Sequence, residues 1–138
     1  MVDIHTHILP GMDDGAKDVA EATALIELLK KQGVAAAVLT PHYHPCIESI
    51  SDFSERRRLS YESIKDCGFD MILASETYLS ESLFSYDSID ELTISNTGHL
   101  LLELPFQENW GSSVFRQLGR IITKYNIRPI IAHAERYE

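Results

Sequence analysis

Val34-Ala35-Ala36-Ala37-Val38-Leu39-Thr40-Pro41-His42 is the most informative segment of this chain for its fold class. Its six consecutive apolar residues indicate a strand covered on both faces, as in a parallel sheet. Thr40 and Pro41 then break the apolar pattern, and a histidine follows directly. The stretch therefore predicts a buried parallel strand that presents His42 at its carboxyl end.

Other short apolar runs of the chain also end in a histidine or a glutamate. The polar residues at these ends are His5 with His7, His42, Glu76, Glu103 and His133. Counted from His5, the successive intervals are 37, 34, 27 and 30 residues, each close to the length of one strand-plus-helix unit. Repetition of that unit brings the carboxyl ends of the strands to one edge. We therefore expect the six side chains to converge, and their nitrogen and oxygen atoms suit a transition metal.

Strand and helix patterns alternate along the chain, which predicts an α/β fold with parallel strands. Strands are expected at Val2–Ile4, Val34–Leu39, Met71–Ala74, His99–Leu104 and Arg128–Ala132. Helices are expected at about Val19–Gln32, Ser51–Lys65 and Ser112–Tyr125, the first opened by Asp18 and Glu21 in a pattern like a capping box. Loops are expected at Leu9–Gly15 and Thr40–Pro45, and two short helical turns within Tyr78–Asn96, at Ser80–Phe84 and Ser88–Glu91.

The composition is that of one globular domain. Its 138 residues are 44% apolar and 24% charged, with a net charge of −9. Because there is no basic or arginine-rich stretch, neither nucleic acid nor an anionic membrane is an expected partner. The apolar runs are too short to span a bilayer and the N-terminus lacks a signal-peptide pattern, so we expect a cytoplasmic protein. Cys46 and Cys67 fit no thiolate zinc pattern and are expected to stay reduced.

Among the candidate metal ligands, His5 and His7 carry the strongest signal. At positions i and i+2 of an extended segment, both side chains point to the same face and can hold one metal. Glu103 lies among leucines, where a charge is costly unless it is paired or bound to a metal. A structural salt bridge is the alternative for Glu103.

The other three candidate ligands have alternatives of their own. A surface loop position is the alternative for His42 and for Glu76, and a hydrogen-bonded core histidine is the alternative for His133. His44 reaches the same site as His42 if the segment between them is extended. His99 begins its strand at the opposite edge, so we expect it to be structural.

Asp14 and Arg136 are candidate catalytic residues. Asp14 follows the His-x-His motif and is expected to serve as a partner of a histidine or as a proton donor, with an ordinary turn residue as the alternative. Arg136 offers a guanidinium that matches phosphate oxygens, with an ordinary surface arginine as the alternative. Neither cysteine is followed by an arginine six residues later, which excludes the thiolate route to phosphotyrosine hydrolysis.

Four motifs occur in a characteristic order. They are Asp3-Ile4-His5-Thr6-His7-Ile8-Leu9-Pro10-Gly11-Met12-Asp13-Asp14-Gly15-Ala16, Thr40-Pro41-His42, Glu76-Thr77-Tyr78 and Ala132-His133-Ala134-Glu135-Arg136-Tyr137. With them the chain resembles, over its whole length, the bacterial PHP-family (polymerase and histidinol phosphatase) protein-tyrosine phosphatases of capsule and exopolysaccharide biosynthesis.

This resemblance implies a distorted (β/α)7 barrel that holds up to three divalent metal ions, usually manganese. The implied metal ligands are His5, His7, His42, Glu76, Glu103 and His133, and Arg136 is the implied phosphate-binding residue. About five βα units are present, and the family's later Asp-x-His pair and second arginine are not. We therefore expect residues 1–138 to be a PHP-type phosphoesterase domain that is incomplete at its C-terminus.

The function implied is metal-assisted hydrolysis of phosphotyrosine on a bacterial tyrosine kinase of polysaccharide biosynthesis. Two alternatives remain open on the sequence alone. One is a small-molecule phosphomonoesterase of the histidinol-phosphatase type, and the other is an inactive fragment that binds a metal or a partner. The metal's identity and the oligomeric state are likewise left open.

Overall fold

The computed structural model describes residues 1–106 and 111–137, and this part of the chain forms two parallel β-sheets with helices around them. The first sheet has the strand order β1-β2-β4 and the second β3-β5-β6-β7. The strands are β1 (Val2–Thr6), β2 (Ala36–Leu39), β3 (His42–Tyr43), β4 (Asp70–Leu73), β5 (Glu76–Tyr78), β6 (His99–Glu103) and β7 (Arg128–Ile131). All their pairings are parallel, so the predicted fold class, α/β with parallel strands, is confirmed.

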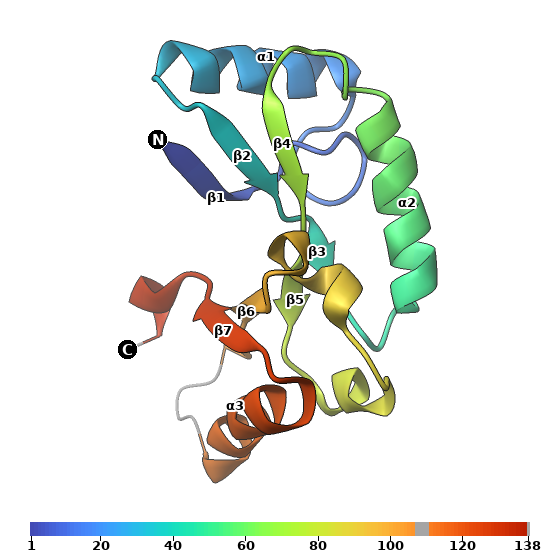
Figure 1. Cartoon of the computed structure of the whole chain (residues 1–138), viewed down its shortest axis with the longest axis vertical. Helices are drawn as coiled ribbons and strands as arrows, with labels where there is room; N and C mark the ends of the chain where they lie inside the picture. Colours follow the sequence, from blue (N-terminus) through green and yellow to red (C-terminus); the bar gives the residue numbers. More distant parts are fainter. Residues whose placement is uncertain (107–110, 138) are drawn as a thin grey trace.

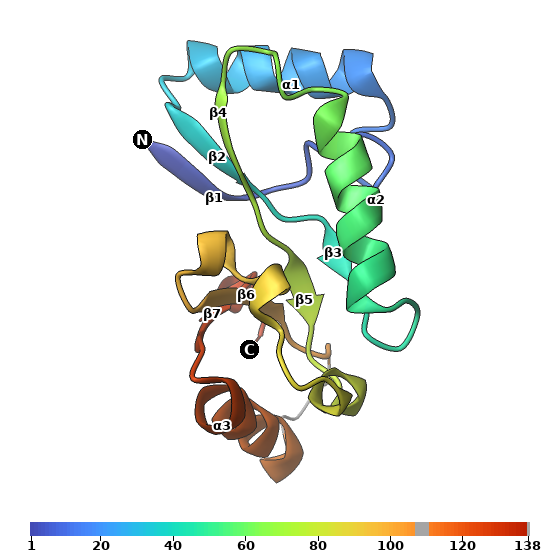
Figure 2. The same cartoon turned by 45° about the vertical axis from the view of Figure 1, so that its right-hand side comes forward.

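Two chain segments pass from the first sheet into the second. After β2 the chain continues through two residues into β3, and after β4 it continues through two residues into β5. Figure 2 shows β4 running on into β5, from the upper part of the molecule to the lower. Because β2 pairs with β4 and β3 pairs with β5, the two segments stay side by side across the break. His42 and Glu76 begin the second half of each segment and are register partners.

The α-helices are α1 (Val19–Lys31), α2 (Ile50–Glu62) and α3 (Ser112–Tyr125). In Figure 1, α1 lies with the first sheet, α3 lies with the second, and α2 runs along the side of both. The Asp18 side chain accepts a hydrogen bond from the backbone N–H of Glu21, so the predicted cap of α1 is confirmed. Asn126 ends α3 in the left-handed conformation, with φ of 55°.

Short 3₁₀ helices fill the chain between β5 and β6 and follow β7. They are η1 (Glu81–Ser85), η2 (Asp90–Leu92), η3 (Ile94–Asn96) and η4 (Ala134–Arg136). The η3 turn packs against both β4 and β6, and η2 packs against α2. This segment therefore lies against both sheets near the place where β4 gives way to β5.

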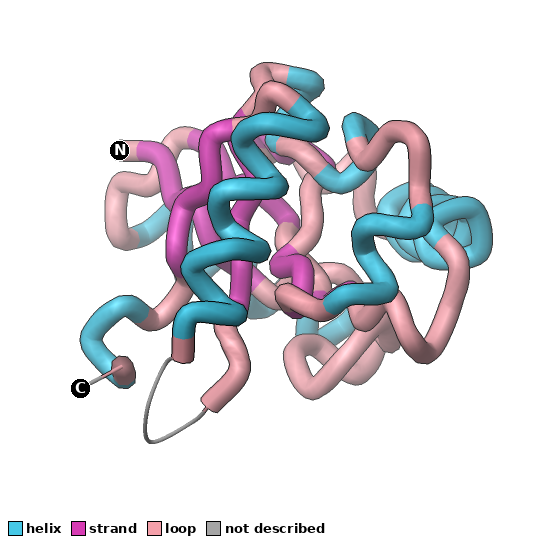
Figure 3. The backbone as a smooth tube through the Cα atoms, turned by 90° about the horizontal axis from the view of Figure 1, so that it is seen from below, coloured by secondary structure: helices cyan, strands magenta, loops and turns pink. Residues whose placement is uncertain are grey.

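One hydrophobic core is shared by the two sheets. Its buried members include Leu39 of β2, Leu100 of β6, Phe53 of α2 and Ile121 of α3. Seen from below, α3 lies across the strands of the second sheet (Figure 3). The apolar face of α3 therefore covers this end of the core.

The structure corrects several sequence-based boundaries. The segment Thr40–Pro45 was expected to be a loop, but His42–Tyr43 forms β3; the expected strand Met71–Ala74 is followed by a further strand, β5. The expected helix Ser51–Lys65 ends three residues earlier, at Glu62. A strand of two or three residues is too short for side-chain alternation to reveal, which explains the first two errors.

Candidate metal centre

Glu76 lies at the centre of a cluster formed by the predicted ligands. Its side chain is 0% exposed, and its Oε2 lies 3.0 Å from His5 Nε2 and 3.1 Å from His7 Nε2. The same oxygen lies 3.4 Å from His42 Nδ1, and Oε1 lies 3.2 Å from His133 Nε2. Four imidazoles thus face one buried carboxylate.

His5 and His7 converge because β1 is extended. Their side chains lie on the same side of the chain, as the i, i+2 spacing predicts, and their Nε2 atoms are 3.1 Å apart. Thr6 points elsewhere: its hydroxyl donates to the carbonyl of Val38 on β2. The pairing of β1 with β2 therefore fixes which face of β1 carries the two imidazoles.

His42 links Glu76 to Glu103. His42 Nδ1 lies 3.7 Å from Glu103 Oε2, and the Glu103 side chain is 13% exposed. β5 pairs with both β3 and β6; Glu76 is the register partner of His42, and Glu103 lies beside Tyr78, two residues further along β5. We call the set His5, His7, His42, Glu76, Glu103 and His133 the histidine–glutamate cluster.

His133 directly follows Ala132 at the end of β7, in a left-handed backbone conformation. Its φ is 50° and ψ is 40°, which is uncommon for a residue other than glycine. Its ring centroid lies 4.9 Å from that of His5. This local strain turns the chain into η4 while the imidazole stays at Glu76.

The cluster fits a divalent cation better than it fits a network of hydrogen bonds. Within the described residues, Glu76 Oε1 and His42 Nδ1 are both buried and neither makes a hydrogen bond, although each lies within 3.4 Å of an ionisable group of the cluster. Buried polar atoms of this kind call for a further partner, such as an ion. His5, His7 and Glu76 form one group of closely spaced metal-ligand atoms, and His42, His44 and Glu103 form another.

Asp13 is a residue of this site that the sequence did not single out. Its Oδ2 lies 2.6 Å from His7 Nδ1 and also accepts from the backbone N–H of His42. Burial raises the pKa of Asp13, but its hydrogen bonds, above all the one from His7, outweigh this and lower that pKa. The ionised carboxylate can only accept, so it holds the proton of His7 on Nδ1 and leaves Nε2 to face the cluster.

The protonation of the cluster follows from burial and close contacts. Burial lowers the pKa of His7, but the hydrogen bonds to Asp13 and Glu76 outweigh it and raise that pKa to about 10. Burial raises the pKa of Glu76, but its contacts with His5 and His7 move it far below its usual range. Without a metal, the cluster therefore combines an ionised glutamate with a protonated His7.

Gly15 allows the loop after β1 to fold back onto His7. A Cβ atom at this position would collide with the carbonyl oxygen and the Cβ of His7. The neighbouring Ala16 N–H donates to that same carbonyl, and the Gly15 N–H donates to Asp13 Oδ1. The loop thus brings Asp13 to His7 only because residue 15 has no side chain.

Asp14 and Arg136, the predicted catalytic residues, both lie at the surface. The Asp14 side chain is 83% exposed, and its Oδ1 lies 3.7 Å from His42 Nε2. Arg136 is exposed on η4, where its backbone N–H donates to the carbonyl of His133. Of the two aspartates, it is Asp13 that contacts His7.

His44 lies beside the histidine–glutamate cluster, whereas His99 lies away from it. His44 belongs to the group with His42 and Glu103, and its ring centroid is 5.2 Å from that of Tyr78. His99 begins β6, at the other end of the strand from Glu103, and its Nδ1 contacts the Thr97 hydroxyl. His99 thus lies at the edge of the strand that the sequence predicts, and its structural role stays a prediction.

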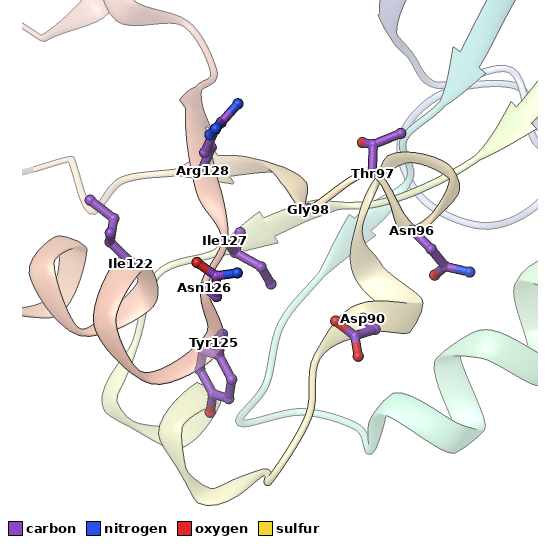
Figure 4. Close-up of a pocket in the computed structure, with 9 residues that line it drawn as sticks. All are labelled: Asp90, Asn96, Thr97, Gly98, Ile122, Tyr125, Asn126, Ile127 and Arg128. Atoms are coloured by element: carbon purple, nitrogen blue, oxygen red, sulfur yellow. The ribbon is translucent and has the colours of Figure 1, made fainter.

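A second polar region lies at the opposite ends of β6 and β7. It is a pocket of about 500 Å³ that we call the polar pocket (Figure 4), lined by Asp90, Asn96, Thr97, Gly98, Ile122, Tyr125, Asn126, Ile127 and Arg128. In Figure 4, Asp90 and Asn96 lie on one wall, across from Tyr125 and Asn126. The lining contains none of the predicted metal ligands among the described residues.

The model of a capsular polysaccharide synthesis family, CpsB/CapC, matches residues 1–138. The chain belongs to this family. The family resemblance inferred from the four motifs is thereby confirmed.

Curated relatives are tyrosine-protein phosphatases by name. CpsB of Streptococcus agalactiae is 32% identical over 99% of this chain and 58% of its own length. The putative phosphatase CapC of Staphylococcus aureus is 31% identical over 99% of the chain, and YwqE of Bacillus subtilis is 28% identical over 99%. The chain thus spans somewhat more than half the length of these relatives.

A solved structure shares the fold. It belongs to a set described as crystal structures of YwqE from Bacillus subtilis and CpsB from Streptococcus pneumoniae, unique metal-dependent tyrosine phosphatases. The TM-score is 0.73 at 24% sequence identity, and the match covers 99% of this chain and 56% of the other.

In residues 1–106 and 111–137, every helix is too short or too polar to cross a membrane.

Proposed function

We propose that this chain carries the metal-binding residues of a metal-dependent protein-tyrosine phosphatase. The observation that carries the proposal is the fully buried Glu76 carboxylate, faced by the ring nitrogens of His5, His7, His42 and His133 at 3.0–3.4 Å. The names of the curated relatives support phosphotyrosine as the substrate. A phosphotyrosine of a bacterial tyrosine kinase of polysaccharide biosynthesis is the target we propose.

The residues that would hold the metal are those of the histidine–glutamate cluster. Imidazole and carboxylate donors together suit manganese, iron and zinc, and we propose manganese, in up to three ions. A divalent metal held here would supply Lewis-acid stabilisation of the charge on a phosphoryl group. Binding a metal through His7 would require an unprotonated Nε2, so His7 would have to lose one of its ring protons.

Four residues of the chain prepare this site. Asp13 fixes the tautomer and the orientation of His7. Glu103, close to His42, extends the donor set to a second carboxylate. Asp14, at the surface beside His42, is proposed to donate a proton to the leaving phenolate, and Arg136 is proposed to bind phosphate oxygens in bidentate fashion.

For the fold we propose the PHP type, a distorted (β/α)7 barrel to which this chain contributes about five βα units. Two features support this proposal. All observed strand pairs are parallel, and β1 and β7 each stand at the end of a sheet. We therefore describe residues 1–138 as a PHP-type phosphoesterase domain.

The experiment that tests the function measures manganese-dependent hydrolysis of a phosphotyrosyl peptide and of histidinol phosphate by the same preparation. We expect faster turnover of the peptide, and we expect it to disappear when His5 and His7 are both replaced by alanine. Leu28→Ala, a substitution at an exposed position of α1, is the control and should retain activity. Faster turnover of histidinol phosphate would show that a small phosphomonoester, and not phosphotyrosine, is the substrate. Turnover that survives the double substitution would refute the proposed site.

A further inference from the structure

Arg57 is a buried arginine that joins α2 to the chain just before Glu76. Only 7% of it is exposed. Its Nη1 donates to the carbonyl of Ala74 at 2.7 Å, and its Nη2 donates to the carbonyl of Glu91 at 2.9 Å. The guanidinium also lies 5.2 Å from the ring centroid of Phe53, one turn earlier on the same helix.

The Ala74 carbonyl lies where the chain leaves the first sheet. The Ala74 N–H still donates to Leu39 at the end of β2, whereas the Glu76 N–H donates to Pro41, just before β3. Between these two bonds the strand passes from one sheet to the other, and Arg57 binds at this bend. Ser75 ties the bend to the same neighbour as Arg57, since its hydroxyl donates to the carbonyl of Leu92 in η2.

Burying the charged guanidinium of Arg57 is energetically unfavourable unless its hydrogen bonds compensate for the lost hydration. Among the described residues no carboxylate is within ion-pair distance of Arg57, its Nε is buried without a partner, and burial lowers its pKa. An aliphatic side chain would fill the space beside Phe53 without this penalty. It would, however, leave the Ala74 and Glu91 carbonyls without their donor.

We propose that Arg57 is a positioning residue that fixes the bend between β4 and β5 and thereby sets the place of Glu76 in the histidine–glutamate cluster. The inference rests on the proposed function only in its consequence for metal binding. The bond from Arg57 to Ala74 is two residues from Glu76, and Glu76 is the residue that four imidazoles face. A small change in the bend therefore moves the central carboxylate relative to all of them.

The first test is independent of any metal and measures hydrogen exchange of the Glu76 amide in the 138-residue chain. Arg57→Met is compared with Arg58→Met, because Arg58 is the next residue of α2, is exposed, and pairs only with Glu55 among the described residues. We expect the Glu76 amide to exchange at least about tenfold faster in Arg57→Met, with a smaller change at the Ile26 amide of α1. Equal acceleration at both amides would show general destabilisation and overturn the inference.

The second test measures manganese affinity of the same variants by equilibrium dialysis. Arg57→Met should weaken binding by about tenfold, the lower end of the effect of residues that orient ligands, and Arg58→Met should leave it unchanged. Wild-type affinity in a folded Arg57→Met would overturn the inference. If the wild type itself binds no manganese, the proposed function fails, and the exchange experiment still decides the role of Arg57.

If Arg57→Met does not fold, Arg57→Lys replaces it in both measurements. Lysine keeps the charge but loses the planar fork that reaches two carbonyls. We expect the Glu76 amide to exchange faster than in the wild type and manganese to bind more weakly, with both changes smaller than those expected for Arg57→Met. Wild-type exchange at Glu76 together with wild-type manganese affinity in Arg57→Lys would contradict the proposed role of the fork.

Discussion

The histidine–glutamate cluster and the polar pocket lie at opposite ends of β6 and β7, and they differ in how their polar groups are held. In the cluster, Glu76 is buried and several of its contacts are between groups that titrate. In the polar pocket, Asp90 is exposed and accepts a hydrogen bond from the Ser88 hydroxyl. Polar residues occur at both ends of these strands. The end at which we propose the metal site differs in that its polar atoms are buried and some of them lack a hydrogen-bond partner.

The largest expected effect comes from Glu76→Gln, which keeps the shape of the side chain but removes its charge. Because four imidazoles face this carboxylate, manganese affinity should fall by about a hundredfold or more, beyond the usual effect of residues that only orient a ligand. Isothermal titration with manganese measures the change. Glu62→Gln, which alters an exposed ion pair with Lys65 on α2, is the matched control and should bind as the wild type does. Equal affinity in the two variants would remove Glu76 from the site.

Asp13→Asn should have the next largest effect. An asparagine at this position no longer holds the proton of His7 on Nδ1 by charge, so we expect manganese affinity to fall by about tenfold to a hundredfold. Asp14→Asn is the control at the adjacent residue, and because Asp14 is largely exposed it should change affinity much less. The reverse order of the two effects would show that Asp14, as the sequence suggested, is the more important aspartate.

Gly15→Ala tests the packing of the loop that carries Asp13. The added Cβ collides with His7, and overpacking of this kind lowers the free energy of unfolding by about 1–3 kcal/mol. Gly119→Ala in α3 is the control, since a Cβ there meets no atom within 4 Å among the described residues, and it should raise stability by about 0.5–1 kcal/mol. Urea denaturation measures both. Unchanged stability in Gly15→Ala would mean that the loop is free to move away from His7.

Asp90→Asn in the polar pocket should have the smallest effect. Its exposed carboxylate accepts from the Ser88 hydroxyl, which an amide oxygen also accepts, so stability should stay within about 0.5 kcal/mol. Manganese affinity should be unchanged, as titration of the variant will show. A loss of manganese affinity comparable to that of Glu76→Gln would show that the polar pocket, and not only the histidine–glutamate cluster, takes part in metal binding.

The parts of the structure that could be predicted are those with a strong local signal. The bounds of α3 agree with its apolar spacing, and α1 begins after Asp18, whose side chain caps it. The convergence of the six predicted ligands could be anticipated, because each lies at or just beyond the carboxyl end of a parallel strand, β1, β2, β4, β6 or β7. The sequence does not show that His42 and Glu76 also begin the further strands β3 and β5.

The parts that could not be predicted depend on contacts between distant segments. The strand breaks after Leu39 and Leu73 arise because each segment pairs first in one sheet and then in the other. The local sequence of these segments does not indicate which strands they pair with. Asp13 and Asp14 are adjacent and chemically identical, so only the folded loop shows which of them meets His7. Arg57 is one of three consecutive arginines of α2. Only the folded structure shows that it is buried and binds backbone carbonyls, whereas Arg56 and Arg58 pair with glutamates.

Anomalous scattering from crystals soaked in manganese shows directly whether Glu76 and its histidines hold a metal. We expect anomalous peaks within bonding distance of the side chains of His5, His7 and Glu76, with further peaks beside His42, Glu103 or His133. A soaked crystal with no peak at Glu76, or with manganese only in the polar pocket, would contradict this expectation.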